Sequence, residues 1–124
     1  MKILVLLVVL ASASALAVAA ESTSVSGKWN VHNNVAGNES DAVCTFVQKD
    51  ADLTGTCKSE QGEAKATGKV DGTKITWSYE SDYNGTTLTL KYSGTLDSAT
   101  NKIAGSVTVD PFGVDGDFTA TPVK

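Results

Sequence analysis

The sequence predicts an all-β domain in which eight antiparallel strands form an up-and-down meander that closes into a barrel. Two observations predict this fold. From Ser26 onward apolar residues alternate with polar ones, as at Ile75, Trp77 and Tyr79, which is typical of strands with one buried face. Short turn sequences separate these segments, so consecutive strands are expected to pair. Closure removes the two free edges that eight strands would otherwise leave, and a two-sheet β-sandwich is the alternative.

The alternating segments define the strands in order. We expect them at about residues 26–33, 41–49, 53–60, 63–70, 73–82, 86–96, 102–109 and 116–123. Two-residue turns that favour tight hairpins are predicted between four pairs of strands, at Asp50-Ala51, Gln61-Gly62, Asp71-Gly72 and Asn84-Gly85.

These four turns also predict which residues face one another. In a two-residue hairpin, residues at equal distances from the turn are paired. From strand to strand, this rule gives one row of facing residues: Cys44, Cys57, Ala66, Trp77 and Tyr92. A register wrong by one residue would bring lysines and threonines into the row, so the row is expected on the inner face.

Residues that share this parity form the expected core. They are Trp29, Val31, Cys44, Phe46, Leu53, Cys57, Ala66, Val70, Ile75, Trp77, Tyr79, Leu88, Leu90, Tyr92, Leu96, Ile103, Val107, Val109, Phe118 and Ala120. Six glycines fall on the same parity, where they permit strong curvature: Gly27, Gly55, Gly68, Gly94, Gly105 and Gly116.

The same register places the two cysteines of the chain, Cys44 and Cys57, directly opposite each other. The pair falls at a non-hydrogen-bonded position, where the Cα atoms of facing strands come closest. The sequence therefore predicts a Cys44–Cys57 disulfide. Two cysteines and one histidine are too few ligands for a typical zinc site, and a catalytic thiol would not face a second thiol.

Short motifs on these strands resemble a known superfamily. Gly27-Lys28-Trp29 resembles the G-x-W signature of calycins, which include lipocalins and avidins. Gly116 to Thr121 is similar to the terminal G-x-F-x-A-T segment of small exported bacterial β-barrel modules, many of unassigned function. The resemblance covers most of residues 26–121. It implies a barrel fold with a ligand held inside.

Residues 1–20 have the layout of a cleavable secretion signal, expected as a helix ahead of the barrel. Met1-Lys2 is a short positive region, Ile3 to Leu10 is an apolar run, and small residues end at Ala20; cleavage after Ala19 also fits. A membrane anchor is the alternative, but it requires about 20 solidly apolar residues. We therefore expect one folded domain, residues 21–124, exported to the periplasm or the extracellular space, with no membrane span after cleavage.

Residues 21–124 are acidic, with nine lysines, 14 acidic residues and no arginine, a net charge of −5. Nucleic acids and anionic lipids require clustered positive charge, so neither is an expected partner. We expect a monomer.

The sequence offers little for catalysis. His32, the only histidine, has the parity of the outer face, where an exposed strand residue is the simplest interpretation. No serine lies in a G-x-S-x-G sequence. Asp110, Asp115 and Asp117 surround a loop, but they do not match a calcium-binding pattern, and turn aspartates commonly bond the local backbone. We expect no metal, no cofactor and no enzymatic activity, and a hydrolase using turn carboxylates is the weakest hypothesis.

Six aromatic residues share the inward parity and are the candidate lining of a ligand site: Trp29, Phe46, Trp77, Tyr79, Tyr92 and Phe118. They predict either a packed core or a partly open interior that binds a small apolar or aromatic ligand. The first hypothesis is a ligand-binding barrel. The alternative is a solid-core barrel that acts through its surface, as an envelope protein or as an inhibitor of another secreted protein.

Overall fold

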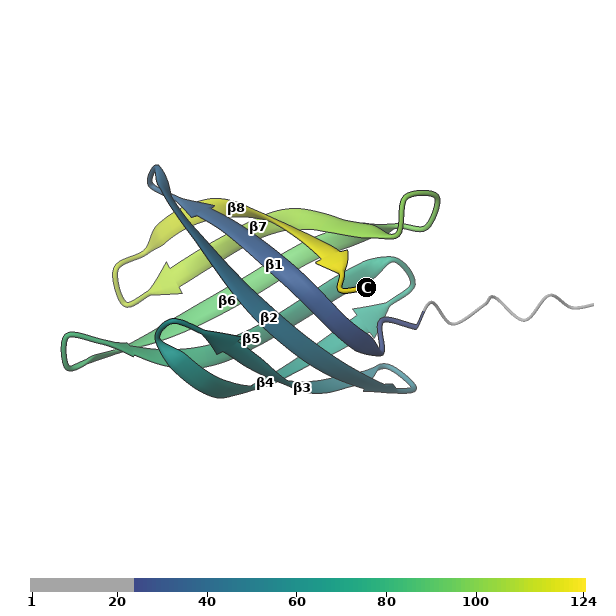
Figure 1. The fold of residues 1–124 in the computed structure, drawn as a ribbon, viewed down its shortest axis with the longest axis horizontal. Helices are drawn as coiled ribbons and strands as arrows, with labels where there is room; N and C mark the ends of the chain where they lie inside the picture. The colour runs from purple at the N-terminus through teal and green to yellow at the C-terminus, as the bar shows by residue number, and fades with distance from the viewer. Residues whose placement is uncertain (1–23) are drawn as a thin grey trace, which may run out of the picture.

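Eight strands of alternating inward and outward side chains close into one barrel in the computed structural model, which describes residues 24–124. The strands are β1 (Gly27–Val35), β2 (Asn38–Lys49), β3 (Asp52–Ser59), β4 (Gly62–Asp71), β5 (Lys74–Tyr83), β6 (Thr86–Asp97), β7 (Lys102–Asp110) and β8 (Val114–Pro122). Their order around the barrel is their order in the sequence, and every neighbouring pair is antiparallel (Figure 1).

This arrangement confirms the up-and-down barrel over the sandwich. The predicted signal, residues 1–20, lies outside the described residues. Within the described part of the chain, no helix is long and apolar enough to cross a membrane.

One hairpin is tighter than the sequence predicts. The expected strands end at residue 33 and resume at residue 41, but in the structure both continue to a two-residue turn at Ala36 (φ 53°) and Gly37 (φ 80°). Positive φ is uncommon for alanine, and an asparagine-rich segment has the composition of a loop, so this turn has no sequence signal. The predicted turn at Asn84 (φ 50°) and Gly85 (φ 81°) is confirmed with type I′ signs.

Two of the four predicted registers are confirmed. Cys44 faces Cys57 across the β2–β3 hairpin, and Trp77 faces Tyr92 across the β5–β6 hairpin. In both hairpins the predicted dipeptide is the turn itself, so equal distances from it give the correct partners.

The other two registers are wrong by two residues. The β3–β4 turn lies at residues 60–61 and the β4–β5 turn at residues 72–73, each one position from the predicted dipeptide. Cys57 therefore faces Ala64 rather than Ala66, and Trp77 faces Gly68 rather than Ala66. A shift of two residues keeps every side chain on its predicted face. A Cβ at Gly68 would overlap the backbone of β5, so Trp77 still faces a residue of minimal size.

The expected core is buried with three exceptions. Leu88, Leu90 and Val109 are only partly buried, and all three lie toward one end of the barrel. Val25 and Ala42 are buried although they were not expected in the core.

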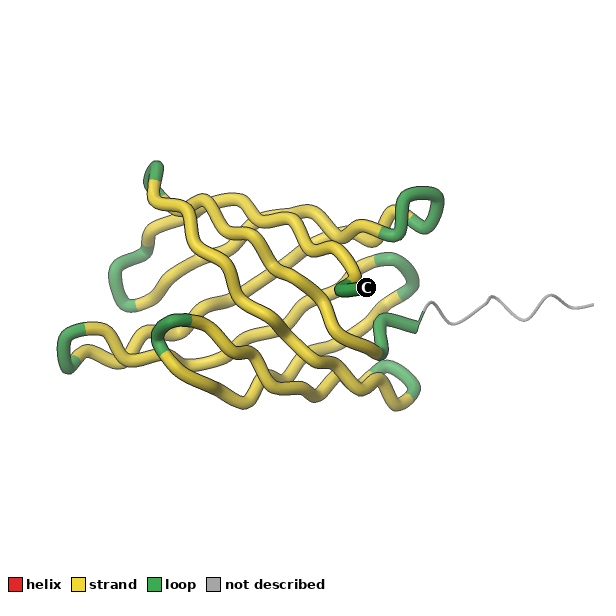
Figure 2. Tube along the Cα trace, in the orientation of Figure 1, coloured by secondary structure: helices red, strands yellow, loops and turns green. Residues whose placement is uncertain are grey.

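The two ends of the barrel differ. The segment before β1 folds across one end: Val25 donates its backbone N–H to Gln48 Oε1 at 2.9 Å, and Trp29 donates Nε1–H to the Val25 carbonyl at 2.9 Å. The opposite end, here called the hairpin end, carries the β1–β2, β3–β4, β5–β6 and β7–β8 connections (Figure 2). The β5–β6 hairpin projects beyond the β3–β4 hairpin there, at the left of Figure 1.

Candidate functional site

Aromatic side chains fill the middle of the barrel. Trp77 stacks on Tyr92 with ring centroids 4.7 Å apart, and Phe46 and Phe118 meet the Trp77 ring edge-on at 5.1 Å each. Offset-stacked and edge-on contacts are the favoured geometries of aromatic pairs. Each of these four side chains is at most 2 % exposed. These four candidate lining residues therefore pack against one another.

The other two candidate residues lie at opposite ends of the interior. Trp29 is 4 % exposed beside the segment that closes the barrel. Tyr79 is 8 % exposed and lies on the side of Tyr92 that faces the hairpin end, with ring centroids 5.8 Å apart. Of the six, Tyr79 lines the cavity described next.

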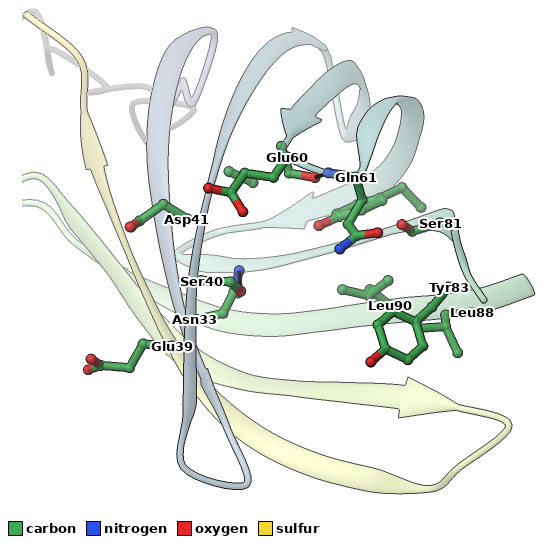
Figure 3. A pocket seen from close by; sticks show the side chains of 13 residues that line it. Asn33, Glu39, Ser40, Asp41, Glu60, Gln61, Ser81, Tyr83, Leu88 and Leu90 are labelled. Atoms are coloured by element: carbon green, nitrogen blue, oxygen red, sulfur yellow. Dashed lines mark hydrogen bonds between the residues drawn. The ribbon is translucent and has the colours of Figure 1, made fainter. Parts of the chain in front are cut away.

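A cavity of about 460 Å³, here called the cup, opens at the hairpin end (Figure 3). Its lining includes Asn33, Tyr79, Ser81, Tyr83, Leu88 and Leu90. Leu88 and Leu90 belong to β6 and form an aliphatic wall near Tyr83, while Asn33 of β1 lies deeper, beside Ser40. The volume lies within the range of roughly 300–1,000 Å³ typical of small-molecule sites.

The floor of the cup is polar. Asn33 is 5 % exposed, and its Nδ2–H donates to Ser40 Oγ at 3.5 Å, which is the outer limit of a hydrogen bond. Asn33 Oδ1 is buried and has no partner among the described residues. The Tyr79 and Tyr92 hydroxyls lie 3.2 Å apart and share one hydrogen bond. A buried amide oxygen without a partner costs free energy, so this position calls for an explanation.

Burial also sets the charge state of the two tyrosines. Loss of hydration raises the pKa of Tyr79, and loss of hydration together with the neighbouring Tyr79 raises the pKa of Tyr92. Both hydroxyls are therefore neutral groups that donate and accept hydrogen bonds, rather than acids or bases at physiological pH.

His32 lies outside the barrel, as predicted from its parity. Its Nδ1 is 2.8 Å from Asp41 Oδ1 and its Nε2 is 3.4 Å from Glu39 Oε1, and its side chain is 43 % exposed. The hydrogen bonds to Asp41 and, second, to Glu39 raise the pKa of His32. With both ring nitrogens engaged by carboxylates, the imidazole is a surface ion-pair partner.

The turn aspartates also have local partners. Thr108 Oγ1 donates to Asp115 Oδ1 at 2.7 Å, and Lys91 Nζ is 3.0 Å from Asp110 Oδ2. Within residues 24–124, no group of three or more histidine, cysteine, aspartate or glutamate side chains is placed to hold a metal ion.

The predicted disulfide is confirmed. Cys44 and Cys57 are bonded, with Cα atoms 4.0 Å apart, which agrees with the close spacing of a non-hydrogen-bonded pair. Disulfides form and persist in oxidising compartments, so this bond is compatible with an exported protein.

Asn33 is a residue of the cup that the sequence did not predict. Asn33 has inward parity, but an asparagine near a predicted loop is ordinarily interpreted as a turn residue. A polar residue at a core position of the alternating pattern was the available signal, since Val31 precedes it on the same face.

The fold and the cup define a class: a closed antiparallel barrel with one end covered, a solid middle and one open end that holds a cavity. No model of a known protein family matches the chain, and no curated protein matches it.

Proposed function

We propose that this protein is an exported, non-enzymatic barrel that binds one small, uncharged, partly aromatic ligand in the cup. One observation carries the proposal: Asn33 Oδ1 is buried at the floor without a partner. The terminal torsion of asparagine is soft, so a small rotation presents this oxygen to a donor in the cup. A ligand hydroxyl or amide N–H would satisfy it.

The walls set the chemistry of the ligand. Leu88 and Leu90 favour an apolar or aromatic body, and the Asn33 and Tyr79 side chains favour a hydrogen-bonding group at its inner end. Glu60 lies at the rim, and the chain is acidic overall, so an anionic ligand is disfavoured.

Export is part of the proposal. The predicted signal at residues 1–20 and the Cys44–Cys57 bond both support an oxidising destination. A calycin-like relationship is proposed on the G-x-W residues, Gly27 to Trp29, which stand at the start of β1 at the closed end.

The test is a titration of isotope-labelled protein with neutral aromatic probes: phenol, indole, benzyl alcohol and benzamide. Binding in the cup predicts chemical-shift changes at the Asn33 side-chain amide and at the β6 wall. Leu90→Glu places a charge in the wall and is expected to abolish them. Val47→Glu is the control, because Val47 is 61 % exposed on the outer face.

If the chemical-shift changes persist in Leu90→Glu, the probes bind elsewhere, and the cup is not the ligand site. An absence of shifts with all four probes would favour the second candidate, a barrel that acts through its surface. The packed aromatic middle supports that candidate, and so does the break in the β4–β5 ladder described next.

A further inference from the structure

The ladder between β4 and β5 stops halfway along the barrel. Its last pair toward the hairpin end is Thr67 with Ser78. Beyond it, residues 62–66 pair only with β3, and residues 79–83 pair only with β6, among the strands that the structure describes. A cleft of about 680 Å³ lies between the two strand segments. The barrel therefore presents two unpaired edges on one side of its open end.

The backbone groups that face this cleft follow from the pairing. In an antiparallel ladder, the N–H and C=O groups of successive residues point alternately to the two neighbouring strands. Ser78 is paired with β4, so Glu80 and Asp82, two and four residues further on, also direct their backbone groups toward the cleft. These groups form an edge that can accept another extended strand.

The side chains on this edge are acidic on the outside. Glu80 and Asp82 are exposed and project from the outer face. Neither forms an ion pair with a lysine of the described residues, and Asp82 accepts only a hydrogen bond from Thr87 Oγ1 at 3.2 Å. A strand that adds to this edge therefore meets two carboxylates without ion-pair partners in the described part of the chain, while Glu63 and Lys65 line the β4 side of the cleft.

On the inside, the same edge leads into the cup. Tyr79 and Ser81 line both the cleft and the cup, so the two cavities meet at these residues. Side chains of a strand alternate between its two faces. A chain lying along β5 would place one set of side chains beside the carboxylates and the other set at the side opening of the cup.

We propose that the edge of β5 between Tyr79 and Tyr83 binds an extended segment of another protein, added antiparallel to β5 in the position that β4 leaves vacant. Its residues opposite Glu80 and Asp82 are basic, and the residue between them is apolar and enters the cup. Backbone hydrogen bonds supply the affinity, while the alternation of basic and apolar residues supplies the specificity. This edge is available to a strand whether or not a small molecule also binds the cup.

The test uses a capped peptide of alternating lysine and leucine, titrated into the purified protein and followed by calorimetry and by amide hydrogen exchange. We expect the amides of Glu80 and Asp82 to become protected. N-methylation of the lysines removes the N–H groups that face β5, and is expected to weaken binding about tenfold or more. N-methylation of the leucines leaves those groups intact and is the matched control.

A second arm changes the protein. Glu80→Lys with Asp82→Lys reverses the charge of the edge and is expected to weaken peptide binding about tenfold or more. Asp71→Lys with Asp117→Lys changes the net charge of the protein by the same amount, but at exposed positions away from this edge. It is expected to weaken peptide binding much less.

Equal binding of the two N-methylated peptides, or no binding of the parent peptide at millimolar concentration, overturns the proposal. Equal weakening by the two double charge reversals also overturns it, because binding would then follow net charge alone. The neutral aromatic probes do not use this edge, so their titration fails or succeeds independently.

Discussion

Replacement of Asn33 by valine is expected to stabilise the protein. The substitution removes an amide oxygen that is buried without a partner, and such a group costs about 1–3 kcal/mol. The hydrogen bond to Ser40 is lost, but at 3.5 Å it contributes little. The Asn33 amide also contacts the Tyr92 hydroxyl, which keeps its hydrogen bond to Tyr79 in the variant. Valine also has a higher strand propensity than asparagine. The control variant Asn34→Val makes the same gain, because Asn34 lies on the same strand, but its side chain is exposed and no buried amide is removed.

The difference between the two variants therefore isolates the buried amide. From these terms, we expect Asn33→Val to unfold with a free energy about 1–2 kcal/mol higher than Asn34→Val. Urea unfolding followed by tryptophan fluorescence measures it. An Asn33→Val variant less stable than Asn34→Val would show that the amide is a satisfied structural group, and that the floor of the cup holds no free acceptor. A stabilised variant that also loses the aromatic probes would show that the amide is retained for binding.

Three further predictions test the rest of the structure. Replacing Cys44 and Cys57 by alanine is expected to lower the free energy of unfolding by about 3 kcal/mol, because the bond, between residues 13 positions apart, restricts the unfolded chain; an unchanged urea midpoint contradicts this. His32 is expected to titrate above 6.5 in an NMR pH series, and Asp41→Asn to bring it down. Because the pKa of His32 is raised in the folded state, its ion pair stabilises the protein fully below pH 6.5, and this stabilisation is lost as the pH rises through the folded pKa. If the contribution of His32 to the free energy of unfolding is larger at pH 8 than at pH 6, the ion pair is refuted. Gly105→Ala would drive a Cβ into the backbone of β6, and should cost about 3 kcal/mol or prevent folding; near-normal thermal stability contradicts this.

The inward face of the barrel was predictable because side-chain alternation is a local property. The two incorrect registers illustrate the point: β3–β4 and β4–β5 are each shifted by two residues, yet Ala66 and Trp77 remain buried. A register shift of an even number of residues leaves every side chain on the same face of the sheet. The tight turn at Ala36-Gly37 was not predictable, because tertiary context holds an alanine at positive φ there.

The candidate site was only partly predictable. The six inward aromatic residues were identified correctly as inward, but parity could not show that Trp77, Tyr92, Phe46 and Phe118 would fill the interior between them. Those contacts join residues from different strands, and their spacing depends on how tightly the barrel curls.

Local patterns predict eight strands, the buried face of each strand and the meeting of the two cysteines, because all three follow from a period of two and from turns within a few residues. The folded barrel adds three features: a solid middle, a cup at the hairpin end with Asn33 at its floor, and the separation of β4 from β5 before they reach that end. These features depend on the twist and closure of all eight strands together, which no local pattern specifies.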